Sequence, residues 1–426
     1  MPTKIVVGAQ WGDEGKGKII DILASQSDIV VRSQGGNNAG HTIKQKDKTY
    51  ALKLIPSGIL FPNVYCYIGA GVVLNPEALF LEIEKLKEEN INFKNFKIDP
   101  RVQIIMPWHI ALDSAQEEKK GKNNIGTTKK GIGPCYCDKV KRVGIRLHEL
   151  INPTTFKEKA KTIGEFNNEV LVKIYNKNPL PIDEIIEKYL SFANQLKQYV
   201  ADVSTLVYEA YCSNKKILFE GAQGAMLDIN FGTYPFVTSS SPISGGVCTG
   251  VGIGPTYIDE IIGVCKAYTT RVGMGPFPSE ILDEKASLIR EKGVEFGTNT
   301  KRKRRIGWFD SVVLNHSKMV NGFNKIALNK LDILSGIETL KICIAYKTKN
   351  GKIIKNFPPC IETLKEITPI YEEMPGFSEN IEDCKTIEEL PTNCKKYILR
   401  IEELCGCRVS MIGVGPKRHQ NIYRNI

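Results

Sequence analysis

The chain has 426 residues, of which 42% are hydrophobic and 25% charged, ordinary values for a globular protein whose core needs no disulfides. Its net charge of +11 favours anionic partners, and the absence of any long apolar stretch excludes a membrane span. Twelve scattered cysteines and no secretion signal predict reduced thiols and a cytoplasmic protein. The Cys-x-Cys pairs 135/137 and 405/407 lack the accompanying spacing of a metal site.

The first segments in chain order are typical of an α/β domain. The β-branched run Lys4–Ala9 predicts a buried parallel strand, which opens into a glycine-rich loop and a helix at Ile19–Leu23. A further helix starts at Asn75, which can cap it, with Pro76 in the first helical position. Other buried strands are predicted at residues 29–32, 102–106 and 216–219.

The second half adds a helical region and a glycine-rich region. Residues 151–214 are mostly amphipathic, which predicts a helical insertion, and residues 221–254 are rich in glycine. A strand at 325–327, a hairpin at 341–354 turning at Asn350-Gly351, a helix at 392–404 and a strand at 408–412 follow. We therefore predict one α/β domain over residues 1–426, with a large, mostly parallel central sheet flanked by helices, a P-loop-like phosphate cradle and the helical insertion.

The loop Gly12–Lys18 has the features of an anion cradle. It combines free backbone amides at a helix start, glycines that let a phosphate approach, and Lys16 as a positive charge. Its spacing is not that of the standard phosphate loop, since Gly17 replaces Ser or Thr, and a plain glycine turn is the alternative. Asp13 and Glu14 would be repelled by polyphosphate unless they bind Mg²⁺ or accept a proton, so the loop predicts chemistry as well as binding.

Three further motifs favour a nucleotide. His41 follows a flexible glycine and can donate to a phosphate oxygen, although a lone histidine is more often structural. Asn329-Lys330-Leu331-Asp332 matches the pattern in which one carboxylate accepts both guanine donors, N1 and N2. The basic run 301–305 is anchored by apolar flanks, so it could clamp carboxylates and phosphates. A solvated face, a nuclear-localisation tract and a nucleic-acid patch are the alternatives for this run.

Taken in order, these segments resemble the adenylosuccinate synthetase family. The similar segments cover nearly the whole chain, and they are Gln10–Lys18, Asn38–Thr42, Gly126–Pro134, Phe219–Gly224, Arg271–Pro278 and Lys330–Asp332. Three positions depart from the family pattern: Asn299 stands where Thr is more common, Lys301 where Gly is, and Gly413 where Ser is.

The resemblance implies a GTP-dependent ligase that forms adenylosuccinate from IMP and L-aspartate, the first committed step of AMP synthesis from IMP. Asp13 would take the proton from N1 of IMP, so that O6 attacks the γ-phosphate, and the aspartate amine would then displace phosphate from 6-phosphoryl-IMP. His41 would act as an acid on the phosphates, and Gln223 would steady the ring. Asp13 and the backbone carbonyl of Gly40 would hold one Mg²⁺ ion per subunit.

The resemblance also implies which residues bind the three substrates. For GTP they are Gly12, Asp13, Glu14, Gly15, Lys16, Gly17, Lys18, Gly40, His41, Thr42, Arg304, Lys330, Leu331, Asp332, Gly413, Val414 and Gly415. For IMP they are Asp13, Glu14, Gly15, Lys16, Asn38, Ala39, Gly40, His41, Thr128, Arg142, Gln223, Thr238 and Arg302. For L-aspartate they are Thr298, Asn299, Thr300, Lys301, Arg302, Lys303 and Arg304. Arg142 would reach the IMP of a neighbouring subunit, which implies a homodimer with neither nucleic-acid nor membrane partners.

The residues themselves leave two other interpretations open. A guanine-nucleotide switch or GTPase would also use the cradle and the Asn-Lys-x-Asp motif, but it needs only GTP and water. A nucleic-acid binder would explain the net charge and the basic run. We expect such a protein to interleave aromatic residues with further basic ones, a pattern that the sequence lacks.

Overall fold

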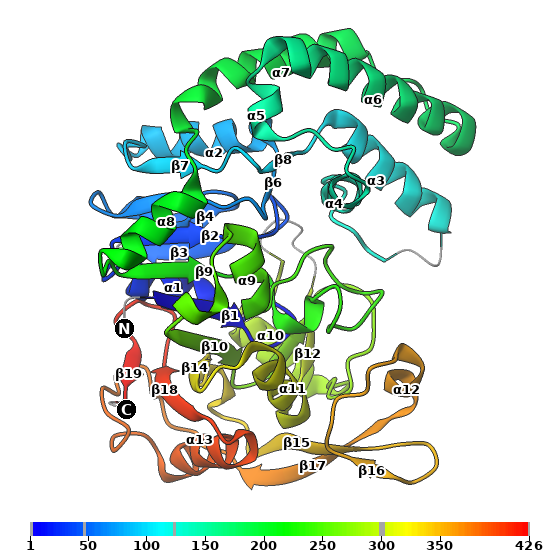
Figure 1. Cartoon of the computed structure of the whole chain (residues 1–426). Helices are drawn as coiled ribbons and strands as arrows, with labels where there is room; N and C mark the ends of the chain where they lie inside the picture. The colour runs from blue at the N-terminus through cyan, green and yellow to red at the C-terminus, as the bar shows by residue number, and fades with distance from the viewer. Residues whose placement is uncertain (1–2, 46–47, 122–124, 298–302, 425–426) are drawn as a thin grey trace.

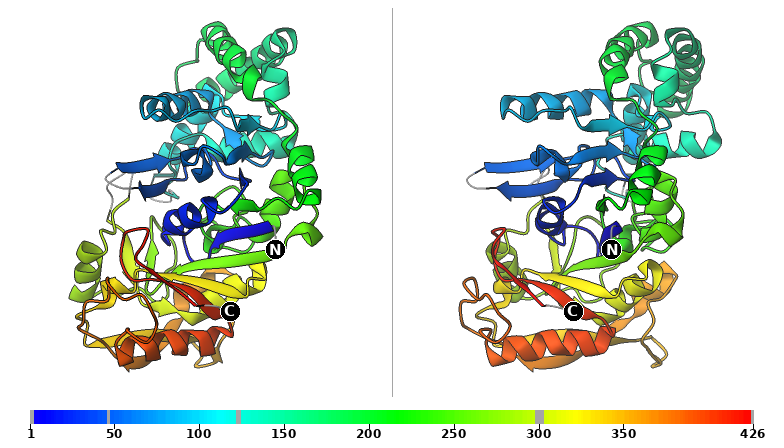
Figure 2. Two further views of the ribbon diagram at one scale, coloured as in Figure 1. Left: turned by 90° about the vertical axis from the view of Figure 1, so that its left-hand side faces the viewer. Right: turned by 60° about the vertical axis from the view of Figure 1, so that its left-hand side comes forward.

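The structure is a computed structural model that describes residues 3–45, 48–121, 125–297 and 303–424. Its elements lie in tiers: the long helices α6 and α7 at one end, a large sheet in the middle, and α13 with strands β15 and β17 at the other end (Figure 1). The two chain ends lie near each other beside the sheet (Figure 2). Among the described residues, no helix has both the length and the apolar character needed to cross a membrane.

A nine-stranded sheet in the order β19-β18-β14-β10-β1-β9-β2-β5-β7 positions the site. Every neighbouring pair of these described strands is parallel except β18 with β19, which confirms the predicted, mostly parallel sheet. The strands are β1 (Thr3–Gly8), β2 (Ile29–Arg32), β5 (Tyr65–Ile68), β7 (Phe96–Ile98), β9 (Ile217–Glu220), β10 (Glu260–Lys266), β14 (Lys325–Asn329), β18 (Arg408–Gly413) and β19 (Asn421–Tyr423).

Helices cover both faces of this sheet, so its central strands are apolar on both sides. In β1, Ile5 and Val7 enter one hydrophobic core and Val6 enters the other. The first core also takes side chains from α8 (Val203–Cys212), α9 (Ser244–Val251), α10 (Glu284–Lys292), α11 (Ser311–Asn321) and α13 (Thr392–Cys405). The second takes side chains from α1 (Lys16–Ala24), α2 (Pro76–Glu88), α3 (Pro107–Lys120), α5 (Leu147–Leu150), α6 (Pro153–Tyr175) and α7 (Ile182–Leu196).

The remaining elements form small sheets and short helices around the main sheet. Helices α4 (Ile132–Lys141) and α12 (Ile361–Glu366) pack in smaller apolar clusters. The minor strands are β3 (His41–Gln45), β4 (Lys48–Leu52), β6 (Val73–Leu74), β8 (Gln103–Ile104), β11 (Thr269–Arg271), β12 (Arg305–Gly307), β13 (Phe309–Asp310), β15 (Thr339–Lys347), β16 (Ile353–Ile354) and β17 (Thr368–Pro375).

Most predicted elements are confirmed. Asn75 caps α2 by accepting from the Ala78 amide at 3.0 Å, and β15 and β16 form the hairpin expected around Asn350-Gly351. Residues 151–214 are largely helical, in α6, α7 and α8. The strand expected at 102–106 is wrong in extent: only Gln103–Ile104 is a strand, which is buried and pairs with β6 outside the main sheet, and α3 starts at Pro107. That residues 1–426 form a single domain stays a prediction.

Candidate active site

The carboxyl ends of six neighbouring parallel strands carry the motifs found in the sequence. Such strands all end at the same edge of the sheet, and ligands of α/β sheets bind outside that edge. From β18 to β2 the last residues are Gly413, Asn329, Lys266, Gly8, Glu220 and Arg32. Segments far apart in the chain therefore meet around the loop that leaves β1.

The loop after β1 is held by its own carboxylate, Glu14. Three residues of the loop have positive φ, Gly12 (85°), Asp13 (58°) and Gly15 (78°), and in Asp13 this is a sparsely populated conformation of the kind that clusters at active sites. The buried Glu14 side chain accepts from the Gly12 amide at 2.8 Å and pairs with Lys16 at 2.6 Å. In this structure Glu14 therefore shapes the cradle and neutralises Lys16, while Asp13 is exposed on the loop.

Helix α1 and the C-terminal turn enclose the cradle closely. A Cβ on Gly17 would lie 2.7 Å from the Thr42 carbonyl oxygen, so the absence of a side chain lets the two segments approach. Lys18 donates to the carbonyls of Gly415 at 2.8 Å and Gln420 at 3.0 Å. Burial lowers the pKa of Lys18 to about 8, with the nearby Asp332 opposing that shift.

The Asn-Lys-x-Asp segment is tied directly to the cradle. Asn329 donates its side-chain amide to the carbonyls of Glu14 (2.9 Å) and Gly15 (3.2 Å). A Cβ on Gly413 would lie 2.7 Å from Asn329 Oδ1, so glycine at this position leaves room for Asn329. Without the more common Ser side chain, residue 413 can contact a base only through its backbone groups. Leu331 is buried, and burial raises the pKa of Asp332.

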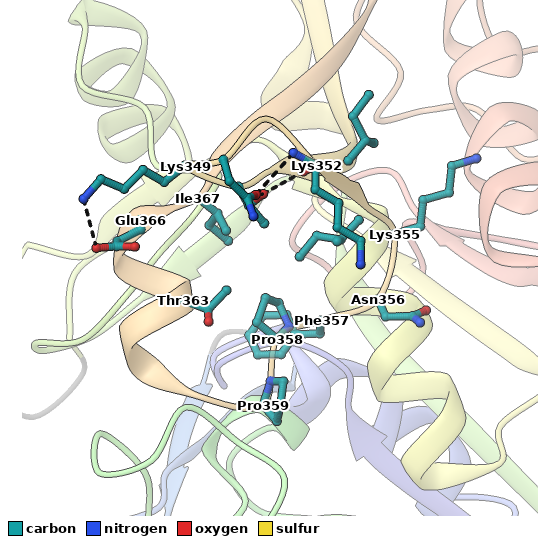
Figure 3. Close-up of a pocket in the computed structure, with 14 residues that line it drawn as sticks. Lys349, Lys352, Lys355, Asn356, Phe357, Pro358, Pro359, Thr363, Glu366 and Ile367 are labelled. Carbon is teal, nitrogen blue, oxygen red and sulfur yellow. Dashed lines mark hydrogen bonds and ion pairs between the residues drawn. The ribbon is translucent and has the colours of Figure 1, made fainter.

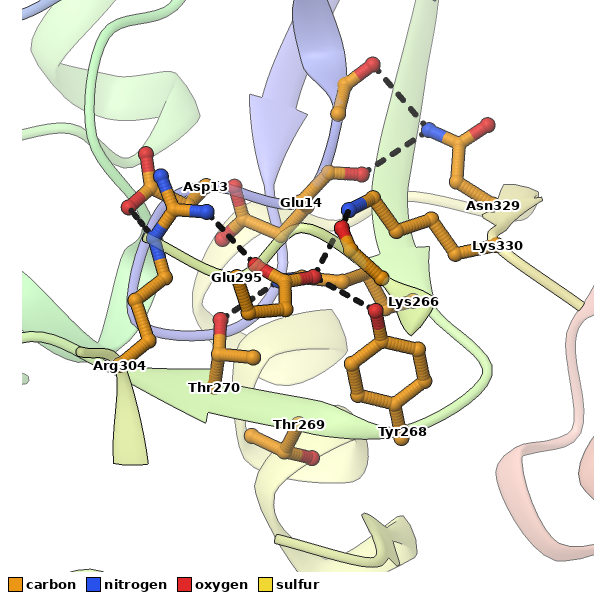
Figure 4. Close-up of polar contacts among 12 residues, drawn as sticks. Asp13, Glu14, Lys266, Tyr268, Thr269, Thr270, Glu295, Arg304, Asn329 and Lys330 are labelled. Atoms are coloured by element: carbon orange, nitrogen blue, oxygen red, sulfur yellow. Dashed lines mark hydrogen bonds and ion pairs between the residues drawn. The ribbon is translucent and has the colours of Figure 1, made fainter. Parts of the chain in front are cut away.

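Arg304 links Asp13 to a buried carboxylate, Glu295 (Figure 4). Its Nε lies 2.7 Å from Asp13 Oδ2, and its Nη1 donates to Glu295 Oε2 at 2.6 Å. Glu295 Oε1 also accepts from Lys266 Nζ (2.9 Å), Lys330 Nζ (2.8 Å) and the Tyr268 hydroxyl (2.6 Å). Burial acts to raise the pKa of Glu295, but the three cations outweigh it and hold that pKa well below its usual range.

His41 is oriented by a second buried carboxylate, Glu220. Nδ1 of His41 contacts Glu220, which also accepts from the backbone amide (2.8 Å) and the hydroxyl (3.0 Å) of Ser57. Burial acts to raise the pKa of Glu220, but His41, Ser57 and Arg32 outweigh it and lower that pKa. Nε2 of His41 is buried with no hydrogen-bond partner among the described residues, so this nitrogen is free to meet a substrate.

Gln223 and Asn38 form an amide pair beside His41. Gln223 has a positive φ of 57°, and its Nε2 donates to Asn38 Oδ1 at 3.3 Å. The Thr238 hydroxyl is buried, with no hydrogen-bond partner in the part of the chain that the structure describes. A buried hydroxyl of this kind normally bonds to something, so Thr238 is suited to receive a polar ligand atom.

Of the remaining residues predicted to bind IMP or L-aspartate, some are exposed and others lie outside the described residues. Thr128 is exposed in the loop before α4, and Arg142 is exposed at the end of α4, where its φ is 65°. Arg142 has no side-chain hydrogen bond or ion pair to another described residue. Thr298, Asn299, Thr300, Lys301 and Arg302 lie outside the described residues, whereas Lys303 is exposed.

The structure leaves both predicted magnesium ligands, Asp13 and Gly40, accessible. The Asp13 side chain is 39% exposed, and a Cβ on Gly40 would meet no heavy atom within 4 Å. Within the described ranges, no group of three His, Cys, Asp or Glu side chains could hold a metal by itself. Mg²⁺ keeps several waters and is usually bound by one or two carboxylates together with substrate phosphates, so a magnesium site here stays a prediction.

An open cavity of about 870 Å³ lies elsewhere, between the β15–β16 hairpin and α12 (Figure 3). Lysines, prolines and Phe357 line it, and its carboxylate Glu366 pairs with Lys349 at 3.6 Å. Its lining residues belong to none of the six similar segments and include no free carboxylate. We therefore assign the chemistry to the sheet edge rather than to this cavity.

Sequence reasoning missed Glu220 and Glu295. Glu220 could have been found, because a carboxylate that ends an apolar buried strand needs a partner. Glu295 gives no comparable signal, since it lies in a loop and its partners are 9 to 35 residues away.

Comparisons with known proteins agree with this geometry. The family model described as adenylosuccinate synthetase matches residues 5–422. The adenylosuccinate synthetase of Caldanaerobacter subterraneus subsp. tengcongensis is 53% identical over 99% of both chains, and that of Lactococcus lactis subsp. cremoris is 52% identical over 99% of this chain and 98% of the relative.

Two solved structures are also similar. Fully ligated adenylosuccinate synthetase from Plasmodium falciparum matches with a TM-score of 0.95 and 41% identity over 100% of both chains. Cyanophage S-2L succinoaminodeoxyadenylate synthetase matches with a TM-score of 0.61 and 18% identity, covering 99% of this chain and 95% of that one, which is a likeness of fold alone.

Proposed function

Because this chain belongs to the adenylosuccinate synthetase family, it joins IMP and L-aspartate in a GTP-dependent ligation, and we propose that Asp13 and His41 are the acid–base groups. The family assignment favours the ligase over the guanine-nucleotide switch. The observation that carries the proposal is the exposed Asp13 carboxylate, held at positive φ in the cradle and in contact with Arg304.

In the proposed reaction, Asp13 takes the proton from N1 of IMP, and O6 then attacks the γ-phosphate of GTP. GDP leaves, and the amine of L-aspartate attacks C6 of 6-phosphoryl-IMP, from which inorganic phosphate departs. An ordinary aspartate has a pKa of about 3.9, so proton removal needs cationic groups that stabilise the oxyanion as it forms. Arg304, whose Nε lies 2.7 Å from Asp13 Oδ2, orients the Asp13 carboxylate in the cradle.

His41 provides the complementary acid. Glu220 fixes Nδ1, so the unpartnered Nε2 can donate to phosphate oxygens. Gln223, already paired with Asn38, orients the purine ring, and the buried Thr238 hydroxyl bonds to IMP. Asp332 accepts hydrogen bonds from the guanine base, which lies beside Leu331 and the Gly413–Gly415 turn.

Asp13 and the Gly40 carbonyl would hold one Mg²⁺ ion per subunit. When bound, this ion would neutralise phosphate charge, and the family's dependence on GTP supports its presence. Arg304, Lys303 and the basic residues before them would bind the carboxylates of L-aspartate.

The active enzyme is a cytoplasmic homodimer in this proposal. The exposed, unpaired Arg142 at the end of α4 supports a contact with IMP in the neighbouring subunit. All twelve cysteines are free thiols, which supports a reducing compartment.

One experiment tests the activity and its route together. The purified chain is mixed with Mg²⁺, GTP, L-aspartate and IMP labelled with ¹⁸O at C6, and the succinylated purine is followed by its ultraviolet shift. We expect product only with all three substrates, and the label in inorganic phosphate. Rapid phosphate release from GTP alone would support the switch instead, and label released into water rather than into inorganic phosphate would exclude the 6-phosphoryl route.

A further inference from the structure

Glu295 belongs to none of the substrate-binding sets above, yet it contacts groups from two of them. We propose that Glu295 is a positioning residue. Its buried carboxylate holds both Lys330, on the guanine side, and Arg304, on the aspartate side, and therefore shapes both binding pockets. This inference rests on the proposed function and on the family resemblance, which implies that Lys330 binds GTP and that Arg304 binds GTP and L-aspartate.

The two oxygens of Glu295 serve different partners. Oε2 accepts from Arg304 at 2.6 Å, whereas Oε1 accepts from Lys330 at 2.8 Å (Figure 4). The remaining Oε1 donors are Lys266 and the Tyr268 hydroxyl. The Glu295 side chain has 0% exposure, so no water competes for these bonds. Moving the carboxylate would therefore move both pockets.

The backbone of Glu295 reinforces the same connection. The Arg304 amide donates to the Glu295 carbonyl at 3.0 Å, and Phe296 forms an isolated antiparallel bridge with Lys303. Both the main chain and the side chain of Glu295 thus bond to Arg304, at the end of the predicted aspartate loop. Lys330 reaches the same turn, because its Nζ also donates to the Gly293 carbonyl at 2.7 Å.

The charges around Glu295 explain why a neutral side chain cannot replace it. Three cations, Lys266, Lys330 and Arg304, surround this carboxylate, and Lys266 has 0% side-chain exposure. Without the negative charge these cations repel one another in a buried setting. The backbone amide of Lys266 donates to Gln10 Oε1 at 3.2 Å and fixes this strand end, so Lys330 and Arg304 are the groups that would shift.

The test compares Glu295→Gln, Glu295→Asp and the control Glu280→Gln. Glu280 offers a matched carboxylate, because it pairs with Arg305, the neighbour of Arg304, at 2.7 Å without touching either pocket. We expect Glu295→Gln to raise KM for GTP and for L-aspartate by about tenfold or more each, and KM for IMP by less than about threefold. Glu295→Asp should recover part of both losses, and Glu280→Gln should cause neither.

Three results would overturn the proposal: equal changes in all three KM values, a rise in only one of the GTP and aspartate values, or lower thermal stability with unchanged KM values. If Glu295→Gln does not fold, the double variant Glu295→Gln/Lys266→Met, which removes one charge of each sign, is measured in the same way. Failure of the wild type to form the succinylated purine would instead remove the proposed function. Calorimetric titration with GDP then still tests the link to the guanine side.

Discussion

The two sides of the active site are each organised by one buried carboxylate, and the two carboxylates have different partners. Glu220, at the end of β9, contacts His41 and the backbone and hydroxyl of Ser57. Glu295 bonds to Lys266, Lys330 and Arg304. In both cases burial acts to raise the carboxylate pKa, and the partners reverse the direction.

The two carboxylate networks are therefore suited to different chemical roles. Histidine is the side chain that ordinarily changes charge near neutral pH, so the Glu220 side can supply and receive a proton. Arginine keeps its charge at ordinary pH, and burial lowers the pKa of Lys266 only to about 8, so at neutral pH the Glu295 side is suited to binding anions rather than to proton transfer. Asp13 leaves β1, which lies between β9 and β10 in the sheet, and therefore stands between the two sides.

The largest expected effect comes from removing Asp13, the proposed base, which lies between the two sides. Asp13→Asn keeps the size of the side chain but removes the negative charge and most of the basicity. We expect kcat to fall by about a thousandfold or more, with GTP binding within about tenfold of wild type. Steady-state kinetics and calorimetric titration with GDP measure the two quantities. A loss of activity under tenfold, which is about 1.4 kcal/mol, would show that Asp13 is not the base.

Glu220→Gln tests the histidine side of the comparison. The amide keeps an oxygen for Ser57 but loses the charge that faces His41, so we expect kcat to fall by about a hundredfold while KM for GTP changes little. The matched control is Glu82→Gln, since the buried Glu82 accepts backbone amides at residues 53–55 without contacting His41. Equal kcat losses in the two variants would mean that Glu220 serves only the fold.

Much of this fold was predictable from local patterns. The β-branched run after Thr3, the Asn75 cap and the Asn350-Gly351 turn each depend on neighbours in the chain, and each appears in the structure. The strand at residues 102–106 was predicted too long, because only Gln103–Ile104 pairs with another strand and the chain then leads through Met106 into α3. Periodicity gives no warning of such a boundary inside an apolar segment.

The site was predictable only where a motif is contiguous. The loop around Asp13 and the segment ending in Asp332 were found from their spacing, and both lie at strand ends as expected. The sequence did not reveal that Glu14 pairs with Lys16 inside the loop, or that Arg304 bridges Asp13 and Glu295. The Arg304 contacts depend on tertiary placement, whereas the Glu14–Lys16 pair depends on the backbone conformation of the loop, and in both cases several side chains of either charge could have served.

Arg142→Leu tests whether each active site lies within one subunit or is completed by a residue of the neighbouring subunit. Arg142 lies outside both carboxylate networks, so we expect KM for IMP to rise about tenfold or more and KM for GTP to change little. Mixing this variant with Asp13→Asn, followed by subunit exchange, should restore up to about a quarter of wild-type activity, because half of the dimers are hybrids with one intact site. Activity that stays at the sum of the separate variants would exclude a shared site.

The smallest effect on activity is expected from Asp310, a buried carboxylate without a cationic partner among the described residues. It accepts from the amides of Val312 and Val313 and from the Tyr346 hydroxyl, yet burial raises its pKa to about 6. This direction is opposite to that of Glu220 and Glu295, as expected where no cation opposes desolvation.

The sign of the resulting pH dependence follows from linkage. Because the folded pKa of Asp310 exceeds the unfolded value of 3.8, the folded state holds this proton more tightly, and stability from this group falls as pH rises from about 4 to about 6. Asp310→Asn removes that dependence while keeping an oxygen for the helix cap. The free energy of unfolding, measured with denaturant from pH 4 to 7, should show the wild type losing on the order of 2–3 kcal/mol relative to the variant. A constant difference between the two proteins over this range would mean that Asp310 titrates as an ordinary carboxylate.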